Sequence, residues 1–216
     1  MSSRYSAHGP EAESEPGSRG RVLRNLQGIK SVREMERRES EALLSATERS
    51  IDETDRDHRF TTEDIRRMHQ LWLRDIYPWA GEYRQVNLAK GDFPFAAAGQ
   101  IPRLMRTFER EALHEFTPCR ATTAMAQAEA LAVVHVELIL IHPFRDGNGR
   151  CARLLAMLMG LQAGLPALNF GGVSGEEKRR YIAAIHAGLD RDYVPMTAVF
   201  GRIIARTMKS ARAWRE

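Results

Sequence analysis

The most unusual stretch of the sequence runs from Ile141 to Arg153 and reads IHPFRDGNGRCAR. Gly147, Asn148 and Gly149 are the residue types that accept a positive φ at the least cost. Successive backbone N–H groups in such a turn form an anion nest, and a following helix adds the orphan amides and the dipole of its N-terminus. The sequence therefore predicts a phosphate cradle between two helices.

Charged and titratable side chains flank this cradle. Arg150 and Arg153 are three residues apart, so they project from one face of the following helix and suit two or more phosphates. Asp146 supplies a carboxylate, and carboxylate together with phosphate oxygens is what Mg²⁺ prefers. His142 supplies an imidazole that accepts a proton near neutral pH. A base, a metal ligand and an anion hole together predict a phosphoryl- or nucleotidyl-transfer site.

Each of these features also has an ordinary structural interpretation. A Gly-Asn-Gly sequence is usually only a loop, a histidine after an apolar helix is more often a C-cap, and Asp146 could cap the next helix. Their joint occurrence within about twelve residues favours the site. A Walker A loop is excluded, because the sequence contains no GxxxxGK[ST].

Helices must hold this loop in place. Apolar spacings of three and four predict helices that start near Ser31, with a capping box to Glu34, and near Thr61. The segment from Thr123 to Ile141 is apolar on most sides, which is typical of a helix in the middle of a bundle. Further amphipathic segments follow at 101–116, 154–158, 181–189 and 196–208. We expect an all-α fold of seven or eight helices.

Residues 83–95 have a different sequence pattern. Tyr83 to Leu88 alternate, Lys90-Gly91-Asp92 is turn chemistry, and Phe93-Pro94-Phe95 follows. This pattern predicts one short β-hairpin, the only strand candidate in the chain. Pro94 confines its arm to a sheet edge.

Composition limits the remaining possibilities. The chain has 216 residues, 43% of them hydrophobic, which is enough for one core. The net charge of +4 comes without any run of five basic residues, so we expect no nucleic-acid partner. With no apolar stretch of about 18 residues and no signal peptide, we expect no membrane association. Two cysteines argue against a disulfide framework and fit a reducing cytoplasm.

The motif itself resembles that of a known family. His142-Pro143-Phe144-x-Asp146-Gly147-Asn148-Gly149-Arg150-x-x-Arg153 matches the Fic family motif HPFx[D/E]GNGRxxR at every fixed position. Residues 65–72 and 76–84 are similar to the segment that leads to the family's flap hairpin. The resemblance implies a Fic core over 60–208, after a disordered tail (1–20) and a helical extension (21–59), with a C-terminal tail at 209–216. It also implies transfer of AMP from ATP to a hydroxyl side chain of a target protein.

The resemblance implies a role for each motif residue. His142 is the general base that deprotonates the target hydroxyl, and Asp146 holds Mg²⁺ between the α- and β-phosphates. Phe144 anchors the loop in the core. The residues expected to hold the phosphates are Gly147, Asn148, Gly149, Arg150 (β-phosphate region) and Arg153 (γ-phosphate).

The hairpin acquires a role by the same resemblance. It corresponds to the flap, and its exposed edge can pair with an extended target segment by β-augmentation, which places a hydroxyl near His142. The expected docking residues are Val86, Asn87, Leu88, Lys90, Gly91, Asp92, Phe93 and Phe95.

Four alternatives remain open. Relatives of the Doc type resemble this fold but act as protein kinases, with Lys in place of the second glycine of the motif, so Gly149 favours nucleotidyl transfer. UTP or another nucleotide could replace ATP, because nothing in the motif reads the base. A degenerate adaptor that binds through its flap is disfavoured by the intact motif, and a nucleic-acid binder by the charge pattern.

Many Fic proteins resemble self-inhibited enzymes, which carry an inhibitory helix with the motif [S/T]xxxE[G/N]. Only Thr107 has a glutamate four residues later, and Ala112 follows it in place of Gly or Asn. The resemblance then implies a separate small antitoxin that supplies a glutamate to Arg153. We expect this chain to be the toxin of a bacterial toxin–antitoxin pair.

Overall fold

The computed structural model describes residues 11, 13–171 and 175–213. The chain divides into two compact units. Unit 1 comprises residues 1–53, 62–106 and 141–151, and unit 2 comprises residues 54–61, 107–140 and 152–216.

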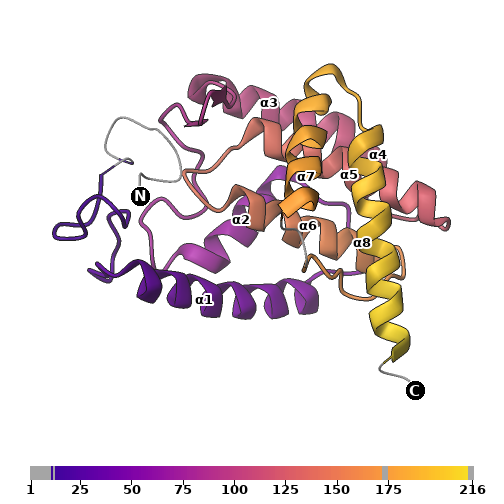
Figure 1. The fold of residues 1–216 in the computed structure, drawn as a ribbon, viewed down its shortest axis with the longest axis horizontal. Helices are drawn as coiled ribbons and strands as arrows, with labels where there is room; N and C mark the ends of the chain where they lie inside the picture. The colour runs from indigo at the N-terminus through magenta and orange to yellow at the C-terminus, as the bar shows by residue number, and fades with distance from the viewer. Residues whose placement is uncertain (1–10, 12, 172–174, 214–216) are drawn as a thin grey trace. The chain divides into compact units, whose positions relative to one another are not determined.

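Unit 1 is built on two helices, α1 (Val32–Glu53) and α2 (Thr62–Leu73), which pack against each other (Figure 1). The Oγ of Ser31 accepts the N–H of Glu34, so the predicted capping box starts α1. Acidic residues occupy the first turn of α2, where the helix dipole favours negative charge. One hydrophobic cluster in the buried core of the unit consists of Val22, Ile29, Met35, Ala46, Trp72, Leu73, Ile76, Tyr77 and Ala80.

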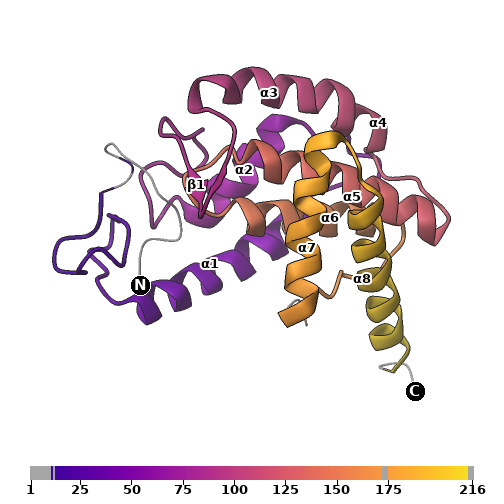
Figure 2. The ribbon, with the colours of Figure 1, turned by 45° about the horizontal axis from the view of Figure 1, so that its top comes forward.

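The predicted hairpin is present but shorter than expected. It consists of β1 (Ala89–Lys90) and β2 (Phe93–Pro94), which pair antiparallel around a turn at Gly91, whose φ is +60° (Figure 2). One further backbone hydrogen bond joins the Phe95 N–H to Leu88. The side chains of Val86 and Leu88 are buried with Phe95 packed against them, so this cluster anchors the base of the hairpin.

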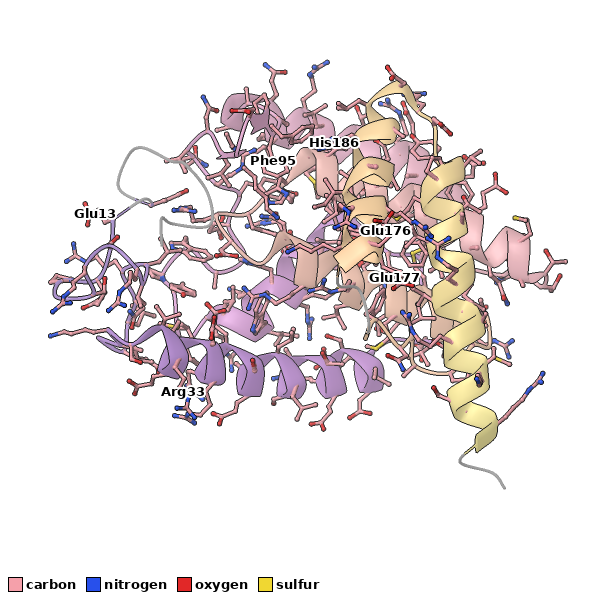
Figure 3. The ribbon with its side chains drawn as sticks, viewed as in Figure 1. Glu13, Arg33, Phe95, Glu176, Glu177 and His186 are labelled. Atoms are coloured by element: carbon pink, nitrogen blue, oxygen red, sulfur yellow. The ribbon has the colours of Figure 1, made fainter. Side chains whose placement is uncertain are left out.

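Unit 2 holds most of α5 (Ala124–Ile141) and of α6 (Asn148–Gln162), with α4 (His114–Phe116), α7 (Gly175–Ala187) and α8 (Val194–Ala213). Helix α3 (Ile101–Phe108) leads into it through a π-helical turn at 109–113. Helices α7 and α8 lie side by side (Figure 1). An ion pair joins them, since Glu177 lies 3.6 Å from Arg206 (Glu177 is labelled in Figure 3).

Helix α5 is mostly buried, which fits its apolar composition. Its 18 residues have a mean hydropathy of 1.7, so by length and composition it could cross a membrane, contrary to the expectation that no stretch reaches this length. However, 61% of it is buried within the protein, and the core helix of a globular protein passes the same test. A short helical turn at Gly188–Asp190 approaches α5 so closely that a Cβ at Gly188 would lie 2.2 Å from Cγ1 of Val136.

The predicted fold class is confirmed, because the described residues are mostly helical with one small two-stranded sheet. The ends differ from the expected tails. Helix α8 continues to Ala213, and 214–216 lie outside the described residues. Of the tail expected over 1–20, residues 1–10 and 12 also lie outside them, whereas Ser14 forms a β-bridge with Leu23 and the Ser18 hydroxyl hydrogen-bonds the backbone of Val22.

Candidate active site

The motif loop begins where α5 ends. His142 has a φ of +52°, a left-handed backbone that stops the helix, and the carbonyls of His142 and Pro143 then face Arg84. The Arg84 Nε–H donates to the His142 carbonyl at 2.8 Å, and the Arg84 backbone N–H donates to the Pro143 carbonyl at 2.9 Å. These two bonds tie the loop to the segment that enters the hairpin.

Arg84 also holds the hairpin itself. Its guanidinium donates to the carbonyls of Val86 at 2.6 Å and Ala96 at 2.5 Å, which stand at the two ends of the hairpin. The side chain is 1% exposed, and burial lowers the pKa of Arg84 to about 10, so it remains charged at neutral pH. We did not single out Arg84 from the sequence as a functional residue, although it ends the flap-like segment 76–84.

The predicted base and the predicted flap meet. The His142 ring stacks on Phe95, with the ring centroids 3.6 Å apart and an interplanar angle of 17° (Phe95 is labelled in Figure 3). His142 is only 4% exposed. A target segment that reaches the imidazole must therefore pass the hairpin side chain that covers it.

The Asn148 side chain closes the loop. Its amide accepts the N–H of Phe144 and donates to the Phe144 carbonyl, both at 2.8 Å, and the residue is 1% exposed. Because this amide is committed to the loop, only the backbone N–H of Asn148 remains suited to an anion, at a helix start where the first amides have no intrahelical acceptor. Phe144 is fully buried, as an anchoring role requires.

The two motif glycines meet different surroundings. Gly147 has a φ of +83°, and a Cβ there would lie 2.6 Å from Cζ3 of Trp72. Among the described residues, a Cβ at Gly149 would meet no atom within 4 Å outside its own helix backbone and chain neighbours. Gly147 therefore serves the packing of the loop on α2, and Gly149 borders open space at the start of α6.

A buried histidine supports the loop from α2. The Nδ1 of His69 accepts the Gly81 N–H at 2.8 Å, so the proton is assigned to Nε2, which donates to the Asp146 carbonyl at 3.1 Å. Its ring stacks on Phe144 with centroids 3.8 Å apart. Burial lowers the pKa of His69 to about 4, so the ring is neutral. The sequence placed His69 only on the buried face of its helix.

Asp146 is the only motif carboxylate. Its Oδ1 accepts the Gly147 N–H at 2.5 Å and lies 3.4 Å from Arg150 Nη2, and the side chain is 18% exposed. No group of three His, Cys, Asp or Glu that could hold a metal occurs among the described residues. A single accessible carboxylate fits Mg²⁺ that brings nucleotide phosphates and water as its other ligands.

The first motif arginine is held by a residue that the motif does not contain. Arg150 Nη1 donates to Oε2 of Glu39 at 2.6 Å, and its guanidinium lies 4.4 Å from the Trp72 ring centroid. Glu39 follows Met35 by four positions, a spacing that puts both on one helix face, and the structure buries that face with Ala46 and Ser50.

Arg153 follows three residues later on α6, within unit 2, and its side chain is exposed. Its charge acts on two buried groups of that unit. Burial, with a smaller effect of Arg153, lowers the pKa of His135 to about 4. Burial raises the pKa of Tyr181 to about 12, against the effect of Arg153.

Comparison with known proteins gives consistent matches. The model of the Fic/DOC family matches residues 59–159. The chain is 27% identical over 153 residues to the probable protein adenylyltransferase Fic of Escherichia coli (strain K12), covering 68% of this chain and 70% of that protein. It is 30% identical over 150 residues to the protein adenylyltransferase fic-1 of Caenorhabditis briggsae, covering 69% of this chain but only 27% of the nematode protein.

Among solved structures, the crystal structure of BepC with bound AMPPNP from Bartonella tribocorum shares the fold, with a TM-score of 0.67 and 23% identity. The alignment covers 84% of this chain and 91% of that one. The family match begins just before α2 and ends within α6, so it spans the hairpin, the buried α5 and the loop from His142 to Arg150. Residues 59–159 of this chain, which include the motif loop, thus match the Fic/DOC family.

Proposed function

We propose that the protein is a protein adenylyltransferase that transfers AMP from ATP to a Ser, Thr or Tyr hydroxyl of a target protein. The observation that carries the proposal is the stacking of the His142 ring on Phe95 of the hairpin, in the same loop whose Gly147–Gly149 turn leads into α6. A base, an anion-binding turn and a strand edge that can pair with a peptide thus occur in the motif loop and the hairpin packed against it. The names of the relatives and the AMPPNP in BepC support the same chemistry.

In the proposed reaction the target hydroxyl gives its proton to His142, and its oxygen attacks the α-phosphorus of ATP. The new bond joins this oxygen to AMP, the bond to the bridging oxygen of the β-phosphate breaks, and pyrophosphate leaves. The backbone amides at the start of α6 stabilise the phosphate charge, because the dipole and orphan N–H groups of a helix N-terminus favour anions. Arg84 fixes the backbone of His142 during this step.

Asp146 is the residue that would hold Mg²⁺. When bound, the ion would reduce the phosphate charge that opposes attack. The His69 Nε2–H holds the Asp146 carbonyl, and the Gly147 N–H holds its carboxylate, so the side chain is oriented before a nucleotide arrives.

The hairpin is the proposed docking edge for the target. The backbone of β1 and β2, with the exposed side chains of Asn87, Lys90 and Asp92, can pair with an extended segment. Val86 and Leu88 contribute differently from the sequence-based expectation, because their buried side chains anchor the hairpin and their carbonyls already accept hydrogen bonds from Arg84 and Phe95.

The decisive experiment uses ATP labelled at one phosphate. The purified chain is incubated with bacterial lysate, Mg²⁺ and either α-labelled or γ-labelled ATP, and proteins are separated on a denaturing gel. We expect label on protein from α-labelled ATP only, and none with the His142→Ala variant. Label from γ-labelled ATP would instead identify a kinase, and ATP binding without transfer of either label would indicate an adaptor.

We further propose that the chain is the toxin of a toxin–antitoxin pair, since it lacks the [S/T]xxxE[G/N] motif. A separate antitoxin would supply a glutamate to Arg153, as a bidentate guanidinium–carboxylate pair. Expression of the chain alone should then arrest bacterial growth, and co-expression of a neighbouring short reading frame should relieve the arrest. If the isolated chain were inactive and removal of residues 1–30 activated it, the inhibitor would lie within the chain.

A further inference from the structure

Glu39 stands out because it is a carboxylate on the buried face of a helix. It is 8% exposed and lies on the stripe of α1 that packs toward α2. Buried carboxylates require partners, since an isolated buried charge is costly. The partners of Glu39 therefore indicate why the helix carries a glutamate where its neighbours on the stripe are Met35 and Ala46.

Both carboxylate oxygens and the backbone carbonyl of Glu39 have partners elsewhere in unit 1. The Oε1 atom accepts the Tyr77 hydroxyl at 2.8 Å, and Oε2 accepts Arg150 Nη1 at 2.6 Å. The backbone carbonyl accepts Trp72 Nε1–H at 2.9 Å. Burial and then the charge of Glu39 raise the pKa of Tyr77, so its hydroxyl remains a donor at neutral pH.

These contacts fix the Arg150 guanidinium on three sides. Glu39 holds Nη1, the Trp72 ring lies 4.4 Å away, and Nη2 points to Asp146 at 3.4 Å. A guanidinium is planar, so a short hydrogen bond from one of its nitrogens limits the directions in which its other N–H donors can point. Glu39 and Trp72 together thus determine which way the remaining edge of Arg150 faces.

Because of the charges around Arg150, the orientation of its donors matters more for nucleotide binding than its electrostatic attraction. Arg150 carries one positive charge between the two carboxylates of Glu39 and Asp146, so these three groups sum to a charge of −1. An arginine compensated in this way adds little net attraction for a polyanion. Arg150 instead favours nucleotide binding because its N–H donors are already oriented toward the phosphate cradle.

We propose that Glu39 is a positioning residue for nucleotide binding, which holds Arg150 against Trp72 and aims its Nη2 edge at the phosphate cradle. The proposal rests on the proposed function in taking a nucleoside triphosphate as the ligand. It adds a residue about a hundred positions before the motif to the site. Loss of the carboxylate frees the arginine to adopt many rotamers, and binding then requires that it be ordered again.

The test measures binding of AMPPNP with Mg²⁺ by calorimetry, together with KM and kcat for labelled ATP. We expect Glu39→Ala to weaken AMPPNP binding and raise KM by about ten- to a hundredfold, the usual worth of a charge-assisted hydrogen bond. Glu39→Gln, which keeps an acceptor for Arg150, should recover part of this loss. Glu36→Ala is the matched control, because Glu36 is exposed on the same helix.

A double-mutant cycle with Arg150→Ala separates positioning from a packing role. If Glu39 acts through Arg150, Glu39→Ala should have no further effect on AMPPNP affinity once Arg150 is removed. An equal loss in both backgrounds would overturn the proposal, as would unchanged affinity in a folded Glu39→Ala variant. Tighter binding or faster transfer in Glu39→Ala would also overturn it, and would make Glu39 a built-in restraint on Arg150.

The choice of measurement distinguishes a variant that fails to fold from a failure of the proposed function. If Glu39→Ala does not fold, Tyr77→Phe removes only the hydroxyl that supports Oε1 and should raise the dissociation constant by a smaller factor, whereas no change would count against the proposal. If the wild type binds AMPPNP but transfers no label, the proposed function fails while the binding cycle still tests Glu39.

Discussion

His69 in unit 1 and His135 in unit 2 share two properties that often mark a functional histidine, burial and a shifted pKa. Both are almost fully buried, and burial lowers the pKa of each to about 4. Their partners differ. His69 joins the Gly81 N–H to the Asp146 carbonyl, and so braces the motif loop, whereas His135 contacts the Ala152 carbonyl and the Tyr181 hydroxyl between helices.

The two rings also use opposite tautomers. His69 carries its proton on Nε2, because Nδ1 accepts an N–H. His135 is assigned a proton on Nδ1, which faces a carbonyl, and Nε2 accepts the Tyr181 hydroxyl at 2.7 Å. A shifted pKa alone therefore does not distinguish a residue that supports chemistry from one that supports packing. The identity of the bonded groups does.

The largest expected effect is that of replacing His142, and it distinguishes His142 from both His69 and His135. We expect His142→Ala to lower kcat for transfer by about 10²–10⁴-fold, the usual cost of losing a general base. Calorimetry with AMPPNP should show nearly unchanged affinity, because the imidazole acts on the incoming hydroxyl. A variant that labelled targets at the wild-type rate would remove His142 from the base role.

Acid stability tests what the two buried rings have in common. Their folded pKa values lie below the ordinary 6.5, so the unfolded chain binds the protons first. Their contribution is complete above pH 6.5 and is lost as the pH falls toward 4, by about 3 kcal/mol for each ring. Urea unfolding between pH 7.5 and 4.5 should show this loss, and removing either histidine should reduce the slope by about one proton.

Substitution of each ring by glutamine breaks the comparison directly. We expect His69→Gln and His135→Gln each to lower the unfolding free energy by about 1–3 kcal/mol, since buried partners lose a hydrogen bond. Only His69→Gln should also lower kcat, by about tenfold or more, because misplaced loop groups are costly for transfer. Equal kcat losses measured at a temperature where both variants are folded would contradict the assignment.

The motif glycines offer the same contrast within one loop. Gly147→Ala should cost about 3 kcal/mol of stability, because it combines a left-handed backbone with a clash against Trp72. Gly149→Ala should leave the melting temperature unchanged or slightly higher, since alanine favours helix and meets no protein atom. It should nevertheless weaken AMPPNP binding. A destabilised Gly149→Ala variant would mean that the space beside it is not open.

The smallest expected effect concerns the partner of His135. Tyr181→Phe removes one hydroxyl from a buried hydrogen bond of 2.7 Å. We expect a loss of about 1 kcal/mol in unfolding free energy and no change in KM or kcat. Thermal unfolding and transfer assays on the same preparation would detect a deviation in either quantity.

Local rules were sufficient for the helices and for the motif. Ser31 starts α1 because a hydroxyl three residues before an N–H can cap it, and Gly91 lies at the hairpin turn because glycine accepts a positive φ. The length of the hairpin was not predictable in this way. Alternation continues back to Tyr83, but the burial of Val86 and Leu88 ends the pairing early, and burial depends on packing.

The sequence by itself determined which residue types the motif offers: an imidazole, a carboxylate, two glycines and two arginines at fixed spacings. Only the tertiary structure decided what holds them. Arg84 reaches His142 across 58 positions, His69 reaches Asp146 across 77, and Glu39 reaches Arg150 across 111. A buried polar group must find a partner, but which one it finds depends on how the helices pack, and no local periodicity encodes that choice.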